Sequence, residues 1–216
     1  MKHGIILAAG RGSRMGHLTG NQPKCRTVLH GKSLLDWQLE ALRGAQVTDI
    51  AIVRGYLAES FDLDVHYFNN HRWSETNMVL SLACSRPWLE QSECVISYSD
   101  IVYSSGSVHT LLGAKGDIVI AYDPDWLRLW HMRFADPLSD AETFRLEGQN
   151  VIEIGNRAQT IDEIEGQYMG LFKLTPTGWA QIEDYLARHT APQRDAMDMT
   201  TLLRGLIQSG TSVGAV

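Results

Sequence analysis

Cysteine is scarce in this sequence: Cys25, Cys84 and Cys94 are the only three in 216 residues, and they lack metal-site spacing. Three thiols cannot all pair, which is typical of a reducing compartment and predicts a cytoplasmic protein. No stretch is long and charge-poor enough to span a bilayer, and the apolar run 4–9 is short for a signal peptide. We therefore expect no membrane association.

The sequence also lacks the basic excess of most nucleic-acid-binding proteins, since its formal net charge is −6. Acidic residues are absent from the first 35 residues, which hold six basic ones, whereas the remainder holds 13 basic and 25 acidic residues. Such a local positive block favours a binding site for a compact polyanion. Charge alone does not distinguish this from a solvated chance cluster.

Strand and helix patterns alternate from the N-terminus to about residue 120. Ser33 is expected to cap a helix with Asp36 at its third position, and Thr76 or Ser74 to cap a helix over 76–85. Apolar runs predict strands at 4–9, 49–53, 65–68, 94–98 and 117–122, and a further helix is expected at 106–114. The alternation predicts an open α/β sheet with helices on both faces, in one domain spanning 1–216.

The pattern changes after residue 122. The segment 123–139 is rich in tryptophan, acids and proline, and it is interpreted as an inserted loop with one helical turn. Strands are expected at 143–146, 151–154 and 167–174, and helices from Thr175 to about His189 and over 198–209. We therefore assign an insertion to 123–147.

Three glycines, Gly10, Gly12 and Gly16, follow the first strand, where backbone N–H groups commonly approach phosphate. A P-loop is excluded because no lysine follows the second glycine. A dinucleotide fingerprint fits poorly, because the spacing is one residue too long and no acid lies near His30.

The cations in and after the glycine loop favour a triphosphate instead. Arg11 and Arg14 lie within the loop, and Lys24 follows Pro23, which restricts Gln22 to extended geometry. These three positive groups suit a triphosphate, because its departing pyrophosphate gains negative charge during the reaction.

The run Leu7-Ala8-Ala9-Gly10-Arg11-Gly12-Ser13-Arg14-Met15 with Pro23-Lys24 resembles the LAAGxGxRM…PK signature of nucleotidyltransferases that make sugar nucleotides and CDP-alcohols. Gly55-Tyr56, Thr76-Asn77 with Ser81-Leu82, Ser99-Asp100 and Tyr168-Met169-Gly170 match in order. Within that superfamily the chain is most similar to small cytidylyltransferases acting on phosphocholine, aminoalkylphosphonates or related molecules. The resemblance implies a single-domain, Rossmann-type (GT-A-like) fold with a mostly parallel central sheet.

The resemblance also implies roles for individual residues. It places the nucleotide at Leu7, Ala8, Ala9, Gly10, Arg11, Gly12, Ser13, Arg14, Lys24, Gly55, Thr76, Asn77, Ser81 and Asp100. Arg14, Lys24 and Asp100 are the expected catalytic residues, with Asp100 holding Mg²⁺. Asp100 follows an apolar strand, where open sheets place ligands, although a turn-capping aspartate is the alternative.

The acceptor residues are harder to predict. The segment 123–147 offers carboxylates, aromatic faces and a cation for a substrate with an ammonium and a phosphate or phosphonate. These groups are Asp123, Trp126, Trp130, Arg133, Asp136 and Glu142. A packed insertion or a dimer contact is the alternative. The resemblance adds Tyr56, Gln167 and Tyr168.

Related chains continue past a strand like 210–216 into a Trp-x-Glu-x-Asp segment, whose aspartate is their usual second metal carboxylate. We expect this sequence to be truncated at Val216, the alternatives being that Asp198 substitutes or that one carboxylate suffices. The expected reaction couples CTP with a small phosphate or phosphonate, releasing pyrophosphate. A sugar-1-phosphate nucleotidylyltransferase and a non-catalytic nucleotide-binding protein are the alternatives, and both a monomer and a homodimer stay open.

Overall fold

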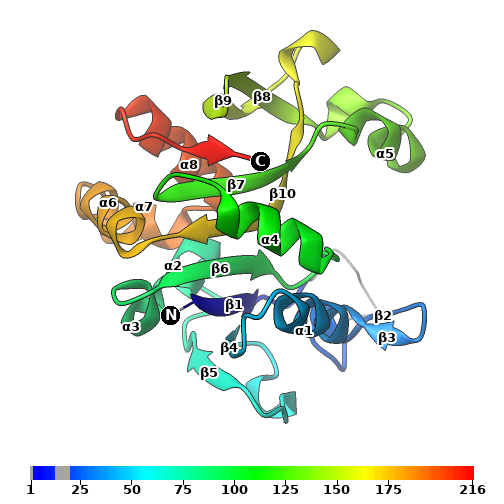
Figure 1. Cartoon of the computed structure of the whole chain (residues 1–216), viewed down its shortest axis with the longest axis vertical. Helices are drawn as coiled ribbons and strands as arrows, with labels where there is room; N and C mark the ends of the chain where they lie inside the picture. Colours follow the sequence, from blue (N-terminus) through cyan, green and yellow to red (C-terminus); the bar gives the residue numbers. More distant parts are fainter. Residues whose placement is uncertain (1, 13–19) are drawn as a thin grey trace.

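The apolar run near the N-terminus forms strand β1, which lies inside a nine-stranded sheet (Figure 1). The computed structural model describes residues 2–12 and 20–216. The strands are β1 (Lys2–Ala8), β2 (Val28–Leu29), β3 (Lys32–Ser33), β4 (Asp49–Arg54), β5 (His66–Asn69), β6 (Glu93–Tyr98), β7 (Ile118–Asp123), β8 (Glu142–Glu147), β9 (Asn150–Arg157), β10 (Gln167–Leu174) and β11 (Gly214–Ala215). The helices are α1 (Leu34–Gly44), α2 (Met78–Ala83), α3 (Arg86–Leu89), α4 (Ser105–Gly113), α5 (Trp126–Arg133), α6 (Pro176–Ala187), α7 (Ala191–Ala196) and α8 (Met199–Gln208).

The large sheet has the strand order β5-β4-β1-β6-β10-β7-β11-β9-β8. The first four strands are mutually parallel, whereas β10 runs antiparallel between β6 and β7. β7 therefore has the direction of β6, and β11 pairs parallel with it. The sheet is mixed with most strands running one way, which confirms the predicted α/β class.

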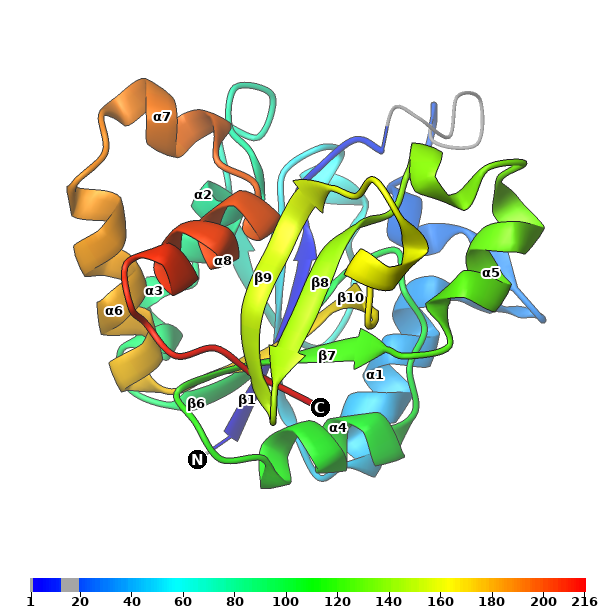
Figure 2. The same ribbon diagram turned by 90° about the horizontal axis from the view of Figure 1, so that it is seen from above.

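Helices cover both faces of the sheet, as predicted from the continuous apolar strands. Ile6 and Ala8 pack in the cluster that includes residues of α1 and α4. Ile5 and Leu7 point the opposite way, into the cluster formed with α2, α3, α6 and α8. Figure 2 shows the second group of helices gathered on one side, with α1 and α4 on the other. Both faces of β1 are thus buried, which fixes its position in the sheet.

Two of the predicted helix starts are confirmed, and one is wrong. The Ser33 side chain accepts from the backbone N–H of Asp36 in a capping box, and Thr175 accepts from Gly178 N–H. The helix expected over 76–85 begins only at Met78, with Asn77 and neither Thr76 nor Ser74 as its cap. The chain before it is held in a turn by backbone hydrogen bonds to Arg72, which delays the helix.

The helical turn predicted within 123–139 is a longer helix in the structure. β7 extends to Asp123, and α5 then forms over Trp126–Arg133 with Trp126 and Trp130 buried. These two tryptophans, about one turn apart, belong to the buried face of this helix. The prediction also omitted the short elements β2, β3, α3 and α7, whereas the strand expected within 210–216 is confirmed as β11. Among the described residues, no helix combines the length and apolarity needed to cross a bilayer.

His3 makes the fold sensitive to acid, and this can be tested. Its ring is 8% exposed and lies 4.2 Å from the Trp88 ring, and burial lowers its pKa below 6.5 while Asp49 opposes the shift. Because the unfolded chain binds this proton near its ordinary pKa, stability is lost as pH falls from 6.5 toward the folded pKa. Urea unfolding between about pH 8 and about pH 5.5 measures this loss. In His3→Phe the free energy of unfolding should fall less steeply with decreasing pH than in the wild-type protein. The exposed-site control His109→Gln should retain the wild-type slope, and an unchanged slope in His3→Phe would contradict the assignment.

Candidate active site

The parallel register brings three loops to one edge of the sheet. Leu7 on β1 pairs with Val53 on β4 and with Tyr98 on β6, so the chain leaves all three strands at the same level. A pocket of about 610 Å³ opens there, lined by Leu7, Gly10, Gly12, Lys24, Met78, Tyr98, Ser99, Asp100 and Arg133. Residues expected at the nucleotide, the metal and the acceptor therefore share one cavity.

Lys24 and Asp100 form an ion pair in this pocket, between side chains that are 29% and 33% exposed. Gly12 has φ +68°, and a Cβ there would lie 3.0 Å from Cδ of Lys24. A side chain at this position would be strained and would press on the lysine. Gly12 thus lets the backbone pack against Lys24, which carries the positive charge into the cavity.

The loop that carries Asp100 is held by a fully buried amide. Nε2 of Gln38, on α1, donates to the carbonyl oxygens of Tyr98 (3.0 Å) and Ile101 (2.6 Å), on either side of Asp100. Its Oε1 accepts from the Ser97 hydroxyl at 3.1 Å. The amide therefore fixes the backbone at both ends of the Ser99-Asp100 turn.

A second pocket, of about 100 Å³, adjoins the first and shares Leu7, Gly10 and Met78 with it. Its remaining lining is formed by Ala9, Trp73, Thr76, Asn77 and Ser81. It is a small, partly apolar slot beside the glycine loop.

Hydrogen bonds fix the wall of this slot. The buried Asn70 amide donates to the hydroxyls of Thr76 and Ser81, both at 3.0 Å. Asn77 caps α2 through its side-chain oxygen and donates to the Ala196 carbonyl at 3.3 Å, so its amide is already bonded within the protein. If Asn77 contacts a base, as expected, one of these two hydrogen bonds would have to break.

Gly55 and Tyr56 support the glycine loop and do not line either pocket. A Cβ on Gly55 would lie 2.6 Å from Cβ of Trp73 and 2.9 Å from the Ala9 oxygen, so only glycine fits. The Tyr56 hydroxyl donates to Gly20 O at 2.9 Å, and the Arg11 guanidinium lies 5.5 Å from its ring centroid. Ser13 and Arg14, expected at the nucleotide, lie outside the described residues.

Of the expected acceptor residues, Arg133 reaches the large pocket, where it lies 5.1 Å from the Trp130 ring centroid. Trp130 itself is 8% exposed, and its indole N–H donates to Asp140. Asp123 accepts from Asp125 N–H in a turn. Burial thus makes Trp130 a packing residue that supports Arg133.

Gln167 and Tyr168 stand at the start of β10. The Gln167 amide is buried and exchanges two hydrogen bonds with the backbone of Glu142, which joins β8 to β10. The Tyr168 ring meets Tyr98 edge-on at 5.8 Å. Burial raises the pKa of Tyr98, and the carboxylates of Asp198, Asp100 and Glu142 add to the shift. The Tyr98 hydroxyl is therefore under the electrostatic influence of Asp100 in the large pocket and also of Asp198 and Glu142.

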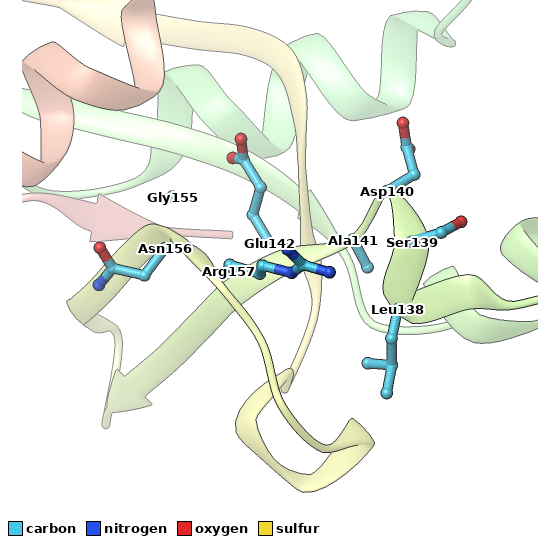
Figure 3. Close-up of a pocket in the computed structure, with 8 residues that line it drawn as sticks. All are labelled: Leu138, Ser139, Asp140, Ala141, Glu142, Gly155, Asn156 and Arg157. Carbon is cyan, nitrogen blue, oxygen red and sulfur yellow. The ribbon is translucent and has the colours of Figure 1, made fainter.

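Glu142 also lines a third cavity, of about 330 Å³, formed by the β8–β9 hairpin and the segment before it (Figure 3). Ser139, Asp140, Asn156 and Arg157 contribute its other polar side chains.

Asp100 suits Mg²⁺ that arrives with a triphosphate. Such sites use one or two carboxylates together with substrate phosphates and water. Among the described residues no three carboxylate, histidine or cysteine side chains cluster for a metal. Asp198 caps α8 by accepting from Thr201 N–H at 2.7 Å.

Four residues that line or support these cavities lie outside the sequence prediction. They are Gln38, Asn70, Trp73 and Arg157. The amides look like ordinary helix and loop residues in sequence, and strand pairing alone brings Glu142 opposite Arg157. Of these residues, Trp73 alone could have been predicted from the sequence, because it lies close to the Thr76-Asn77 segment.

A phosphate-type glycine loop, a lysine and a strand-end aspartate, together at the edge of a mixed α/β sheet, define a nucleotidyltransferase. The chain belongs to the MobA-like NTP transferase domain family, whose model matches residues 4–158.

Known proteins similar to this chain include several cytidylyltransferases. A CTP:phosphoglutamine cytidylyltransferase from Campylobacter jejuni is 37% identical over 98% of this chain and 90% of its own length. A choline-phosphate cytidylyltransferase from Streptococcus pneumoniae is 35% identical over 44% of this chain and 41% of its own. The inositol-1-phosphate CTP transferase of T. maritima superposes with a TM-score of 0.75 at 18% identity, covering all of this chain and 84% of that one. That structural likeness shows the shared fold.

Removing the Gln38 amide should displace the Asp100 loop. Gln38→Leu leaves two part-buried carbonyls without this donor, at about 1–3 kcal/mol each, so the free energy of unfolding should fall by about 2–6 kcal/mol. Nucleotidyl transfer should fall at least tenfold and recover in part at high Mg²⁺, as a loosened metal ligand requires. The exposed-site control Gln208→Leu should change neither quantity. Full activity in Gln38→Leu would show that the loop holds its position without the amide.

Lys24→Ala should remove one positive group from the charge that develops on the transferred phosphoryl and on departing pyrophosphate. The expected loss is about 2–4 kcal/mol in transition-state stabilisation, measured as kcat/KM. Lys32→Ala is the matched control, because Lys32 lies outside the pocket in an exposed ion pair with Glu40. A Lys24→Ala enzyme with unchanged kcat/KM would exclude this role.

Proposed function

We propose that this chain is a CTP-dependent cytidylyltransferase that transfers CMP to a phosphorylated amino-acid amide of the phosphoglutamine type. The observation that carries the proposal is the 37% identity to the phosphoglutamine enzyme, which extends over 98% of this chain. The pocket containing Lys24, Asp100 and Arg133 supports it, because these residues combine groups for a triphosphate, its metal and a phosphorylated acceptor.

The proposed reaction is a single in-line displacement. An oxygen of the acceptor phosphate forms a bond to the α-phosphorus of CTP, and the bond from that phosphorus to the bridging oxygen of pyrophosphate breaks. Lys24 would neutralise the leaving charge, and Arg133 would orient the acceptor phosphate. Mg²⁺, when bound at Asp100, would screen the triphosphate charge.

The nucleotide would lie across both adjoining pockets. The slot beside Ala9, Trp73 and Ser81 would take the base, and the glycine loop at Gly10 and Gly12 would approach the phosphates. In the free protein Lys24 and Asp100 neutralise each other. Binding would exchange that contact, the lysine turning to phosphate and the aspartate to the metal.

A cytoplasmic location is part of the proposal. All three thiols are free, and Cys25 and Cys94 are buried. Burial raises the pKa of both to about 12, so neither is an accessible thiolate at neutral pH. A homodimer stays a prediction.

Pyrophosphate release with each of the four ribonucleoside triphosphates tests the proposal. The acceptors are glutamine phosphorylated on its side-chain amide, phosphocholine, 2-aminoethylphosphonate and glucose 1-phosphate. We expect release with CTP and the first acceptor to exceed every other combination, and Lys24→Ala to abolish most of it. Preferred use of glucose 1-phosphate would instead indicate a sugar-1-phosphate enzyme, and CTP binding without release would indicate a nucleotide-binding protein.

A further inference from the structure

The third cavity combines charges of opposite sign. Glu142 begins β8, Arg157 ends β9, and the two residues are partners in the antiparallel register. The cavity of about 330 Å³ opens beside them, with Asp140, Ser139 and Asn156 around it. Figure 3 shows the carboxylates of Asp140 and Glu142 projecting to the same side.

Opposite charges on neighbouring strands normally pair, but these do not. Among the residues that the structure describes, neither Glu142 nor Arg157 belongs to an ion pair. Cross-strand partners of opposite charge usually stabilise a hairpin through direct contact. Their separation leaves one cationic and one anionic group to contact a ligand in the same cavity.

The surroundings of Glu142 favour a bound cation. Its side chain is half-buried, and burial together with the carboxylates of Asp198 and Asp140 raises its pKa, against the smaller opposing effect of Arg204. The Arg204 guanidinium donates to the Gly155 carbonyl. An ammonium group here would meet the carboxylates of Asp140 and Glu142, whereas Arg157 on the adjacent strand offers a guanidinium to a carboxylate.

Two features connect this cavity with the reaction pocket. Arg133 lines the pocket of Lys24 and Asp100, and the chain continues from it into the 3-10 turn Pro137–Ser139, whose end lines the third cavity. Tyr98 also lines the reaction pocket, and its hydroxyl is within the electrostatic influence of both Asp100 and Glu142. One small acceptor could therefore place one end in each cavity.

We propose that this cavity binds the zwitterionic α-amino-acid end of the acceptor, with its carboxylate on Arg157 and its ammonium at Glu142 and Asp140. The phosphorylated end then lies at Arg133 in the reaction pocket. This inference rests on the proposed function and adds the residues that select the acceptor. Phosphocholine and 2-aminoethylphosphonate carry a cation but no carboxylate, so they leave Arg157 without a partner.

Two acceptors that differ in one group test the role of Arg157. The first is glutamine phosphorylated on its side-chain amide, and the second is its decarboxylated counterpart, phosphorylated 4-aminobutanamide. Losing a charge-assisted hydrogen bond should lower kcat/KM roughly 10- to 100-fold for the second acceptor in the wild-type protein. In Arg157→Gln the ratio between the two acceptors should fall to about one.

Arg145→Gln is the matched control, since Arg145 is an exposed arginine of the same hairpin that lies outside the cavity. It should keep the wild-type ratio. Glu142→Gln should likewise remove the preference for phosphorylated glutamine over its deaminated counterpart. A wild-type ratio near one, or a preference that survives in Arg157→Gln, overturns the inference.

The assay separates failure of this inference from failure of the proposed function. CMP transfer to phosphocholine but not to phosphorylated glutamine would leave the cytidylyltransferase intact and overturn the amino-acid site. Absence of pyrophosphate release with all acceptors would overturn the proposed function, and this inference with it.

Discussion

The register of β1 between β4 and β6 is the constraint on which the rest of the site depends. Leu7 is paired on both sides, and its strand is buried on both faces, so a shift by one residue would turn Ile5 and Leu7 into the opposite cluster. Because the strands are parallel, their following loops emerge together. The glycine loop and Asp100, some ninety residues apart in sequence, meet for this reason.

Backbone pairing brings these loops together, and buried amides then set their shape. Gln38 bonds the chain on both sides of Asp100, and Asn70 bonds both hydroxyls of the base slot. Neither amide lines either of these two pockets. Leaving a buried polar group unpaired costs more free energy than an ordinary hydrogen bond contributes. The two amide side chains therefore hold their loops in a single arrangement.

The buried parallel core and the glycine loop were predictable because their signals are local: continuous apolar strands, a capping box at Ser33, and glycines beside cations. Trp130 was assigned to the acceptor for its aromatic face and Gln167 through the family resemblance, yet tertiary packing buries both. The helix start at Asn77 depended on a turn closed through Arg72. The opposition of Glu142 and Arg157 depended on a hairpin register, which no short-range pattern in one sequence reveals.

Strand β10 runs against its neighbours, and the three cavities divide along the chain. The two adjoining pockets come mostly from residues up to Asp100, whereas the third cavity comes wholly from 138–157. Because β10 enters the sheet from the opposite end, its first residues support the later half by bonding Glu142. If the third cavity selects the acceptor, as we propose, mutations that alter acceptor choice can accumulate in one contiguous stretch of the gene while the two adjoining pockets stay unchanged.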